Sequence, residues 1–159
     1  MEEQLQEKAV LVGLNITTNV KKIDDIDINE SMAELKELVK AAGAEVLASV
    51  IQNKPARDAA YFIGKGKVEE IRDYCHMLGA TMIVFNDELS GAHMRNIEDV
   101  TGLKVIDRTA LILDIFAQRA LSKEGKLQVE LAQLKYRLPR LYGMGGQMSR
   151  TGAGIGTRG

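Results

Sequence analysis

Short apolar runs alternate with segments of helical periodicity over the first two thirds of the chain. The apolar runs cover residues 9–14, 46–51, 81–85 and 103–106. Aliphatic and β-branched side chains predominate in them, and runs of this length between turn residues predict buried strands. We expect residues 61–63 to form a further short extended piece. This part of the chain therefore contains several short strands.

Between these runs, apolar residues recur every three or four positions and predict helices. The first helix is expected to begin at residues 31–34, where a serine and a glutamate have the capping-box spacing, and to end at Gly43. Residues 21–30 before it form an acidic loop in this interpretation. Another helix opens at residues 64–67, and Ser90 caps the next. Strands and helices that alternate through short connections predict a parallel sheet flanked by helices.

The pattern changes after residue 107. We expect a helix from Thr109 to about Ala120, a turn at residues 122–125, and a second helix that Pro139 ends. The second helix has leucines at heptad-like spacing, and the first offers apolar partners for them. The expected seam comprises Leu127, Leu131, Leu134 and Leu138 on the second helix, with Leu111, Ile112, Ile115 and Phe116 on the first. An antiparallel two-helix hairpin follows from this pairing.

The fold class predicted from these patterns is α/β. A small parallel sheet flanked by helices forms an α/β subdomain over residues 1–107, and the helical hairpin covers residues 108–140. Residues 141–159 contain 7 glycines in 19 residues and are expected to form a linker. Residues 154–159 match G-x-G-x-x-G, but a dinucleotide-binding loop needs a strand before it and a helix after it. We therefore expect no such site there.

Composition places the chain among ordinary globular proteins. It has 159 residues, of which 45% are hydrophobic and 27% charged. No apolar run reaches the roughly 18–20 residues of a membrane helix, and the first residues have no signal-peptide pattern. The single cysteine, Cys75, cannot form an internal disulfide. A cytoplasmic protein without a membrane span is expected.

Charge is distributed unevenly along the chain. The net charge of −1 combines −4 over residues 1–60, −3 over residues 61–118 and +6 over residues 119–159. A basic segment on an acidic body favours contact with a polyanion, above all a nucleic acid. The alternative is an ordinary solvated helix face followed by an unstructured tail.

The connection between the two hairpin helices is the principal candidate binding site. Cationic side chains crowd it, next to residues that make a tight turn, so it suits contact with RNA phosphates and recognition by shape. The candidate RNA-binding residues of the hairpin are Arg119, Ser122, Lys123, Lys126, Lys135 and Arg137. The alternative is that the hairpin serves self-association through its leucines.

Residues 64–67, Gly-Lys-Gly-Lys, are a secondary candidate. A glycine-rich helix start directs backbone N–H groups outward, so Lys65 and Lys67 are candidate phosphate contacts. The Walker A ending is absent, and close packing at a glycine-rich helix start explains the motif equally well.

Carboxylates that follow two predicted strands suggest a further alternative, a nucleotide-binding α/β module using Asp87 and Asp107 with Glu88 beside them. Asp107 also stands where a helix cap is needed. No base–nucleophile pair accompanies these carboxylates, and Cys75, the neighbouring histidine and His93 lack zinc-site spacing. We therefore assign no catalytic residue, metal ligand or cofactor-binding residue.

Several of these segments occur in an order that resembles the HflX family of ribosome-associated GTPases. The segments that carry the resemblance are residues 61–70 (YFIGKGKVEE), 85–90 (FNDELS), 105–109 (VIDRT), 113–120 (LDIFAQRA), 124–131 (EGKLQVEL) and 152–159 (GAGIGTRG). Together they span roughly residues 55–159, and their combination is specific although each is weak alone.

The resemblance implies that the chain is the N-terminal part of such a GTPase, without the G domain. The parent protein would bind and hydrolyse GTP with Mg²⁺, bind the large ribosomal subunit and its rRNA, and separate or rescue stalled ribosomes. In that family the hairpin tip reaches toward the peptidyl-transferase region, which corresponds to residues 119–126 here. Its partners would be the ribosome and its own G domain, with the protein itself a monomer and no cofactor held by these residues.

Overall fold

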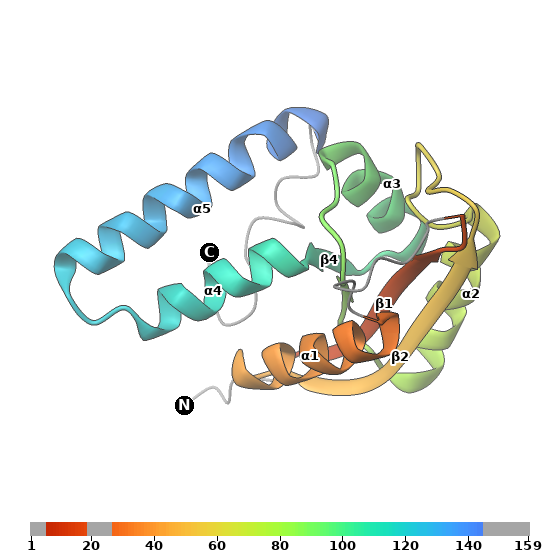
Figure 1. The fold of residues 1–159 in the computed structure, drawn as a ribbon, viewed down its shortest axis with the longest axis horizontal. Coiled ribbons are helices and arrows are strands. Elements are labelled where there is room, and N and C mark those ends of the chain that lie inside the picture. The colour runs from red at the N-terminus through yellow and green to blue at the C-terminus, as the bar shows by residue number, and fades with distance from the viewer. Residues whose placement is uncertain (1–5, 19–26, 145–159) are drawn as a thin grey trace.

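The computed structural model describes residues 6–18 and 27–144. Strands and helices alternate along the chain up to β4, and two successive helices follow (Figure 1). The elements are β1 (Lys8–Ile16), α1 (Ile28–Ala41), β2 (Glu45–Lys54), α2 (Lys65–Leu78), β3 (Met82–Phe85), α3 (Gly91–Thr101), β4 (Lys104–Asp107), α4 (Arg108–Arg119) and α5 (Lys123–Met144).

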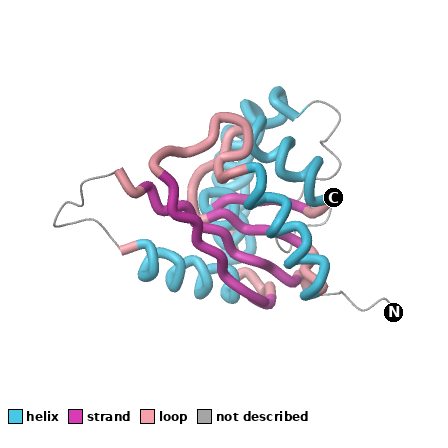
Figure 2. The backbone as a smooth tube through the Cα atoms, turned by 90° about the vertical axis from the view of Figure 1, so that its right-hand side faces the viewer, coloured by secondary structure: helices cyan, strands magenta, loops and turns pink. Residues whose placement is uncertain are grey.

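The four strands form one parallel sheet in the order β2-β1-β3-β4. Helices lie on both of its faces, as Figure 2 shows. The predicted α/β class and parallel sheet are therefore confirmed. Strand order was not predictable, because it depends on which neighbour each strand pairs with after its helix crosses the sheet.

Alternate side chains of each strand face opposite layers, so the core has two halves. The half under α2 and α3 includes Val10, Val12, Ile83 and Phe85 from the sheet, with Val68, Ile71, Cys75, Met94 and Ile97 from the helices. The half under α1 and α4 includes Leu11, Met82, Val84 and Ile106, with Met32, Leu35, Val39, Leu111 and Ile115. The helices thus flank the sheet in a three-layer arrangement.

The first helix begins earlier than the sequence predicts. Asp27 caps α1 by accepting a hydrogen bond from the backbone N–H of Asn29 at 3.3 Å. Ser31 lies inside the helix, and its hydroxyl instead accepts a hydrogen bond from the Asn86 side chain at 2.8 Å. The predicted capping box is therefore wrong, because a tertiary contact to the end of β3 uses the serine. Most of the predicted acidic loop lies outside the described residues.

The remaining short elements follow the sequence closely. Residues 61–63 contribute one antiparallel bridge between Phe62 and Asp58 rather than a strand of the sheet. Gly64 precedes α2, and Ser90 caps α3 with His93 completing a capping box. Asp107 caps α4, as its position after a strand predicted.

The hairpin differs from its prediction at both ends of α5. Lys123 already belongs to the helix, so the connection is shorter than the predicted turn at 122–125. Pro139 does not end α5, which continues to Met144 with the proline inside it. Proline removes its own N–H hydrogen bond and crowds the preceding turn, but the Arg140 side chain just beyond it anchors the helix to the body. The start of the predicted linker, residues 141–144, is therefore helical, and residues 145–159 with their G-x-G-x-x-G lie outside the described residues.

The predicted leucine seam is wrong. The leucines of α5 are between 48% and 57% exposed, and Phe116 of α4 is exposed as well. Leu111 and Ile115 face the sheet instead of α5. The apolar side of α4 is occupied by the body, so α4 has no second apolar side to offer the leucines. We call this set the leucine face: Leu127, Leu131, Leu134 and Leu138.

Candidate nucleic-acid interface

Helices α4 and α5 form an arm that projects from the α/β body (Figure 1). The arm begins where Asp107, the last residue of β4, caps α4 by accepting a hydrogen bond from the Ala110 N–H at 3.0 Å. The 12 residues of α4 span about 18 Å at 1.5 Å per residue. The connection to α5 therefore lies about one helix length, roughly 18 Å, from the end of β4.

Ser122 organises this connection. Its hydroxyl accepts a hydrogen bond from the Gly125 N–H at 2.9 Å, and its carbonyl accepts one from the Lys126 N–H at 3.0 Å. Serine at this position satisfies N–H groups that the first turn of α5 leaves free. The short connection is thus fixed by a helix cap.

At the other end, a polar joint holds α5 to the body. The Tyr136 hydroxyl donates to Asp107, which also accepts a hydrogen bond from the Leu89 N–H at 2.9 Å. Arg140 donates to the Leu89 carbonyl at 3.0 Å and to the Glu88 carboxylate at 2.6 Å. We call these five residues the arm joint.

Burial of the joint keeps Tyr136 a hydrogen-bond donor. Burial raises the pKa of the Tyr136 phenol, and the adjacent Asp107 carboxylate raises that pKa further. The Arg140 guanidinium stacks on the Tyr136 ring at 3.5 Å and donates to the Tyr136 carbonyl at 2.8 Å. Aromatic stacking and directional hydrogen bonds together fix the orientation of this part of α5.

A glycine lets α3 approach the joint closely. A Cβ built on Gly91, the first residue of α3, would lie 2.3 Å from the Arg140 carbonyl oxygen. No side chain fits there. The contact between α3 and α5 is thus made by backbone, and it determines where α5 starts to leave the body.

Polar side chains line the space between α4 and α5. Gln133 donates to the buried Asp114 carboxylate at 3.1 Å. A groove of about 340 Å³ lies between the helices, and it is lined by Ala117, Lys126, Glu130, Gln133, Leu134 and Arg137. Two of the predicted RNA-binding cations, Lys126 and Arg137, therefore line this groove.

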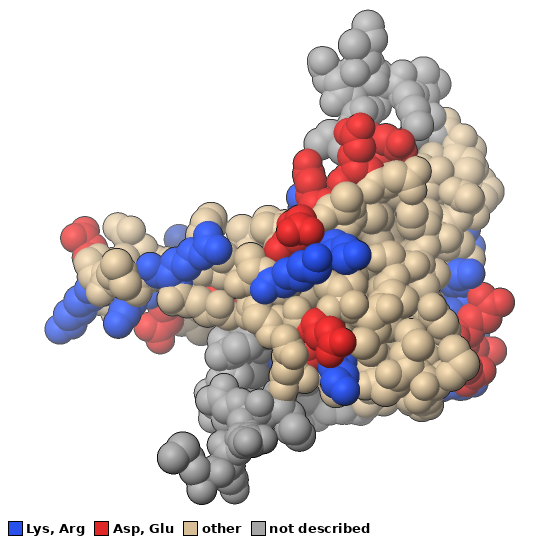
Figure 3. All heavy atoms as spheres, turned by 90° about the horizontal axis from the view of Figure 1, so that it is seen from below, with Lys and Arg blue, Asp and Glu red and all other residues tan. Residues whose placement is uncertain are grey.

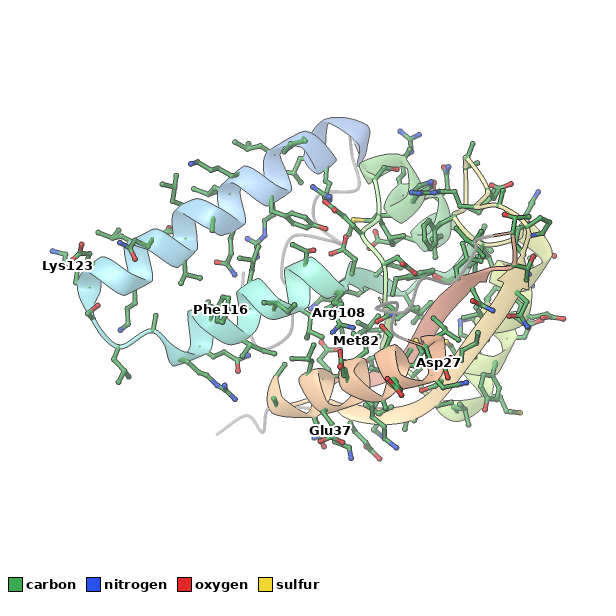
Figure 4. All side chains as sticks on the ribbon, in the orientation of Figure 1. Asp27, Glu37, Met82, Arg108, Phe116 and Lys123 are labelled. Carbon is green, nitrogen blue, oxygen red and sulfur yellow. The ribbon has the colours of Figure 1, made fainter. Side chains whose placement is uncertain are left out.

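The other hairpin cations point elsewhere. Arg119 and Lys123 are exposed at the end of the arm, where Figure 4 labels Lys123. Lys135 is exposed outside the groove. Lys and Arg side chains recur along the projecting arm in Figure 3, with acidic ones among them. The arm thus presents exposed cations at its tip and on more than one side.

The secondary candidates lie far from the arm. Lys65 and Lys67 begin α2, on the opposite side of the molecule from the α4–α5 connection (Figure 1). Lys65 is exposed, whereas Lys67 pairs with Glu70 at 3.1 Å. The Gly64 N–H donates to Gln52 at 2.9 Å. The two groups of predicted cations therefore cannot form one continuous site.

Two of the three carboxylates considered for chemistry, Asp107 and Glu88, have structural partners. Asp107 holds the arm joint and Glu88 pairs with Arg140. Burial raises the pKa of the Cys75 thiol to about 11, so the thiol is not a nucleophile at neutral pH. Within the described ranges, no group of three His, Cys, Asp or Glu side chains is placed to hold a metal ion.

Sequence analysis did not identify the arm joint. Arg140 meets Glu88 and Leu89 from 52 and 51 positions away, and Tyr136 meets Asp107 from 29 away. No local period links such residues. The one available signal was the spacing of Tyr136 and Arg140, a single helical turn apart on one side of α5.

No helix in the described part of the chain is both long and apolar enough to cross a membrane.

The fold and the arm define a class of protein: an α/β body with a cation-bearing helical arm, as found at the start of certain GTP-binding proteins. The family model described as GTP-binding GTPase N-terminal matches residues 29–117, and that described as GTP-binding GTPase Middle Region matches residues 119–159.

Curated relatives define the family more narrowly. GTPase HflX of Caldanaerobacter subterraneus subsp. tengcongensis is 53% identical over 97% of this chain, and GTPase HflX of Escherichia coli is 44% identical over 96%. The chain belongs to the HflX family of GTPases. It covers 34% of each of these relatives, so it spans about a third of their length.

Solved structures agree with this assignment. The chain is similar to a GTP-binding protein from Sulfolobus solfataricus in complex with GDP, with 27% identity and a TM-score of 0.62. The match covers 86% of this chain and 39% of that one. A second structure, of SsGBP with GDP, matches with 27% identity and a TM-score of 0.65, over 86% of this chain and 37% of that one.

Proposed function

We propose that the arm docks on rRNA of the large ribosomal subunit, as the N-terminal part of an HflX GTPase that splits or rescues stalled ribosomes. The observation that carries the proposal is the exposed cationic connection at the far end of α4, a helix about 18 Å long. A narrow arm with cations at its tip suits an RNA cavity, where phosphates dominate affinity and shape selects the site.

The arm joint supports this role. Docking through a tip is specific only if the arm keeps its direction, and freedom lost on binding reduces affinity. Asp107 fixes the start of α4 while Tyr136 and Arg140 fix α5 to the same part of the body. The arm is therefore preorganised at its base, and its tip is free to enter a cavity.

GTP and Mg²⁺ would belong to the part of the protein that corresponds to the other two thirds of its relatives. The 159 residues contain no G-x-x-x-x-G-K-[ST] sequence to hold phosphates. In this proposal GTP in that other part controls docking, and the α/β body and arm contribute binding without chemistry.

The proposal is tested by co-sedimentation of the chain with purified large ribosomal subunits between about 50 and 200 mM salt. A protein with 6–10 phosphate contacts should lose roughly 10³–10⁵ in affinity over that range. Replacing Arg119 and Lys126 by glutamate should weaken binding at least tenfold and flatten the log–log salt slope by about two.

A matched control replaces Lys54 and Arg72 by glutamate. The change in net charge is the same, but Lys54 lies beside the start of α2 and Arg72 lies within α2, on the opposite side of the molecule from the α4–α5 connection (Figure 1). The control should leave the slope nearly unchanged, because these side chains contact no phosphate that is bound at the tip. Equal losses for the two pairs, or unchanged binding of the Arg119 and Lys126 variant, would refute a site at the tip.

Self-association is a second candidate function, and the exposed leucine face favours it. Leucines this exposed along one side of a helix are typical of a surface that a partner covers. Sedimentation equilibrium should then detect a concentration-dependent dimer that Leu131→Glu abolishes and that Gln128→Glu, at an exposed neighbouring position, preserves. A monomer at all concentrations would eliminate this candidate.

A further inference from the structure

One large apolar side chain lies at the far end of the arm, in the connection between α4 and α5. Leu121 is 92% exposed, which is the highest fraction among the large hydrophobic side chains of the described ranges. Met77 of α2 follows at 73%, and the leucine face lies between 48% and 57%. A single exposed leucine is common on protein surfaces, so its position and its surroundings decide whether it has a role.

The backbone on both sides of Leu121 is fixed by hydrogen bonds. The Ala120 N–H donates to the Phe116 carbonyl at 2.9 Å, which closes the last turn of α4. On the other side, the Ser122 hydroxyl accepts a hydrogen bond from the Gly125 N–H at 2.9 Å. Leu121 therefore lies between two anchored residues, and a partner that covers it has little backbone freedom to remove.

The two neighbours of Leu121 turn their side chains inward. Ala120 has an extended backbone, with φ of −68° and ψ of 122°, so successive side chains there point to opposite sides. A Cβ built on Gly125 would lie 3.0 Å from the Ser122 hydroxyl oxygen and 4.0 Å from the Ala120 Cβ. Both neighbours therefore face the first turn of α5, whereas Leu121 faces solvent.

Folding of the arm does not require a leucine at this position. The connection is capped by the Ser122 side chain and the Ala120 backbone, and neither core cluster of the described residues includes Leu121. A polar residue suits an exposed turn better than an apolar one. An apolar side chain in water gains free energy only when a partner covers it.

Cations around Leu121 decide which partner fits. Arg119 and Lys123 are exposed on either side of it, and Lys126 is exposed about one turn into α5. Figure 4 places Lys123 at the end of the arm. Glu124 is the one carboxylate of this segment, and it lies in the first turn of α5, where the helix dipole favours a negative charge. The tip therefore keeps a net positive charge and suits a polyanion.

An apolar side chain among cations matches an exposed nucleobase among phosphates. Proteins recognise RNA mainly at unpaired bases whose faces are free, because the deep groove of paired RNA does not admit side chains. Apolar side chains also contact base steps as wedges in other nucleic-acid complexes. We propose that Leu121 packs on the face of an unpaired rRNA base while the flanking cations bind neighbouring phosphates. This inference rests on the proposed docking of the arm and names the chemical group that the tip recognises.

The test compares Leu121→Ser with the unsubstituted chain in co-sedimentation with large ribosomal subunits between about 50 and 200 mM salt. We expect Leu121→Ser to weaken binding about tenfold at every salt concentration without changing the log–log slope, because an apolar contact releases no counterions. Leu138→Ser, at the other end of the leucine face, is the matched control and should bind like the unsubstituted chain. Both substitutions lie at exposed positions and should leave the urea midpoint of unfolding unchanged.

Photo-leucine, a diazirine analogue of leucine, identifies what covers this position. With photo-leucine in place of Leu121, irradiation of the complex should link the chain to unpaired bases of rRNA. Cross-links to ribosomal proteins alone, unchanged affinity of Leu121→Ser, or an equal loss for Leu138→Ser would each overturn this inference. These outcomes differ from an absence of binding by the unsubstituted chain, which would overturn the docking proposal as well.

Discussion

Asp107 joins three parts of the molecule through one buried side chain. It ends β4, caps α4, accepts the Leu89 N–H and accepts the Tyr136 hydroxyl. A buried carboxylate is stable only when donors surround it, and here the donors come from separate elements. The helix cap was predictable, whereas its role in holding α5 was not.

Tyr136→Phe tests that role. Removal of one hydrogen bond to a charged group should lower the free energy of unfolding by about 1.5 kcal/mol, since Asp107 keeps its two backbone donors. Urea denaturation measures this change. Tyr74→Phe, at an exposed position, should change stability by less than about 0.5 kcal/mol, and equal effects of the two substitutions would contradict the assigned bond.

In contrast to Asp107, Asp87 lowers the stability of the folded chain when its carboxyl group ionises. Because burial raises its pKa in the folded chain, the folded state keeps the proton at pH values where the unfolded state has released it. The free energy of unfolding should therefore fall as pH rises from about 4 through the raised pKa. Asp87→Asn should accordingly be more stable than the unsubstituted chain at pH 7, and this advantage should shrink below about pH 4.

Chemical denaturation at several pH values between 3.5 and 7 measures this effect. Asp73→Asn, at an exposed position of α2, serves as the control and should show no such trend. A variant Asp87→Asn that is less stable at pH 7, or a difference that does not depend on pH, would contradict the prediction.

At the scale of elements, the direction of the arm depends on how closely α3 meets α5. Gly91→Ala should cost about 1–3 kcal/mol, because the new Cβ would meet the Arg140 carbonyl oxygen, which cannot move without shifting α5. Gly66→Ala is a suitable control. A Cβ at Gly66 has no neighbour within 4 Å and lies in α2, so this substitution should stabilise the chain by about 0.4–1 kcal/mol. Thermal denaturation measures both changes in stability. Changes of the same sign in the two variants would contradict the close contact between α3 and α5.

The leucine face yields a second prediction at this scale. Leu131→Ser should change the free energy of unfolding by less than about 0.5 kcal/mol, because Leu131 is half exposed and packs against no core cluster. Leu111→Ala should cost about 2–5 kcal/mol, because that side chain is fully buried under α4. Similar large losses for both variants would mean that the leucines are packed inside the arm.

At the scale of the whole molecule, the body and the arm differ in charge. The body carries a negative net charge, and the segment from residue 119 onward is basic. Figure 3 shows acidic side chains gathered on the body beside the arm. Such a distribution orients the molecule so that the arm leads toward an RNA surface.

Neutralising part of the body should therefore accelerate association with large ribosomal subunits. Replacing Glu30 and Glu37 of α1 by glutamine should raise the association rate about two- to fivefold at 50 mM salt and leave it unchanged at 0.5 M, where screening removes long-range repulsion. Stopped-flow association kinetics measure both conditions. A gain that persists at 0.5 M salt would point to a direct contact of α1 instead.

Local pattern alone determined the element types, the parallel α/β class and most helix caps. Gly64, Ser90 and Asp107 act within a few residues of their own position, so the chain specifies them without its tertiary fold. Uneven charge along the chain also pointed to the arm as the binding element, because the net charge of a segment does not depend on how it folds.

The tertiary structure alone decided which surfaces are free. Heptad-like spacing predicts that the leucines of α5 pack against apolar residues of α4. Leu111 and Ile115 of α4 pack against the sheet instead, because their burial there completes the core. For the same reason Ser31 bonds Asn86 instead of capping α1, and α5 continues past Pro139 because Arg140 is bound to a distant loop. Competition between partners that are far apart in the sequence leaves no local pattern, and it set the direction of the arm and the exposure of the leucine face.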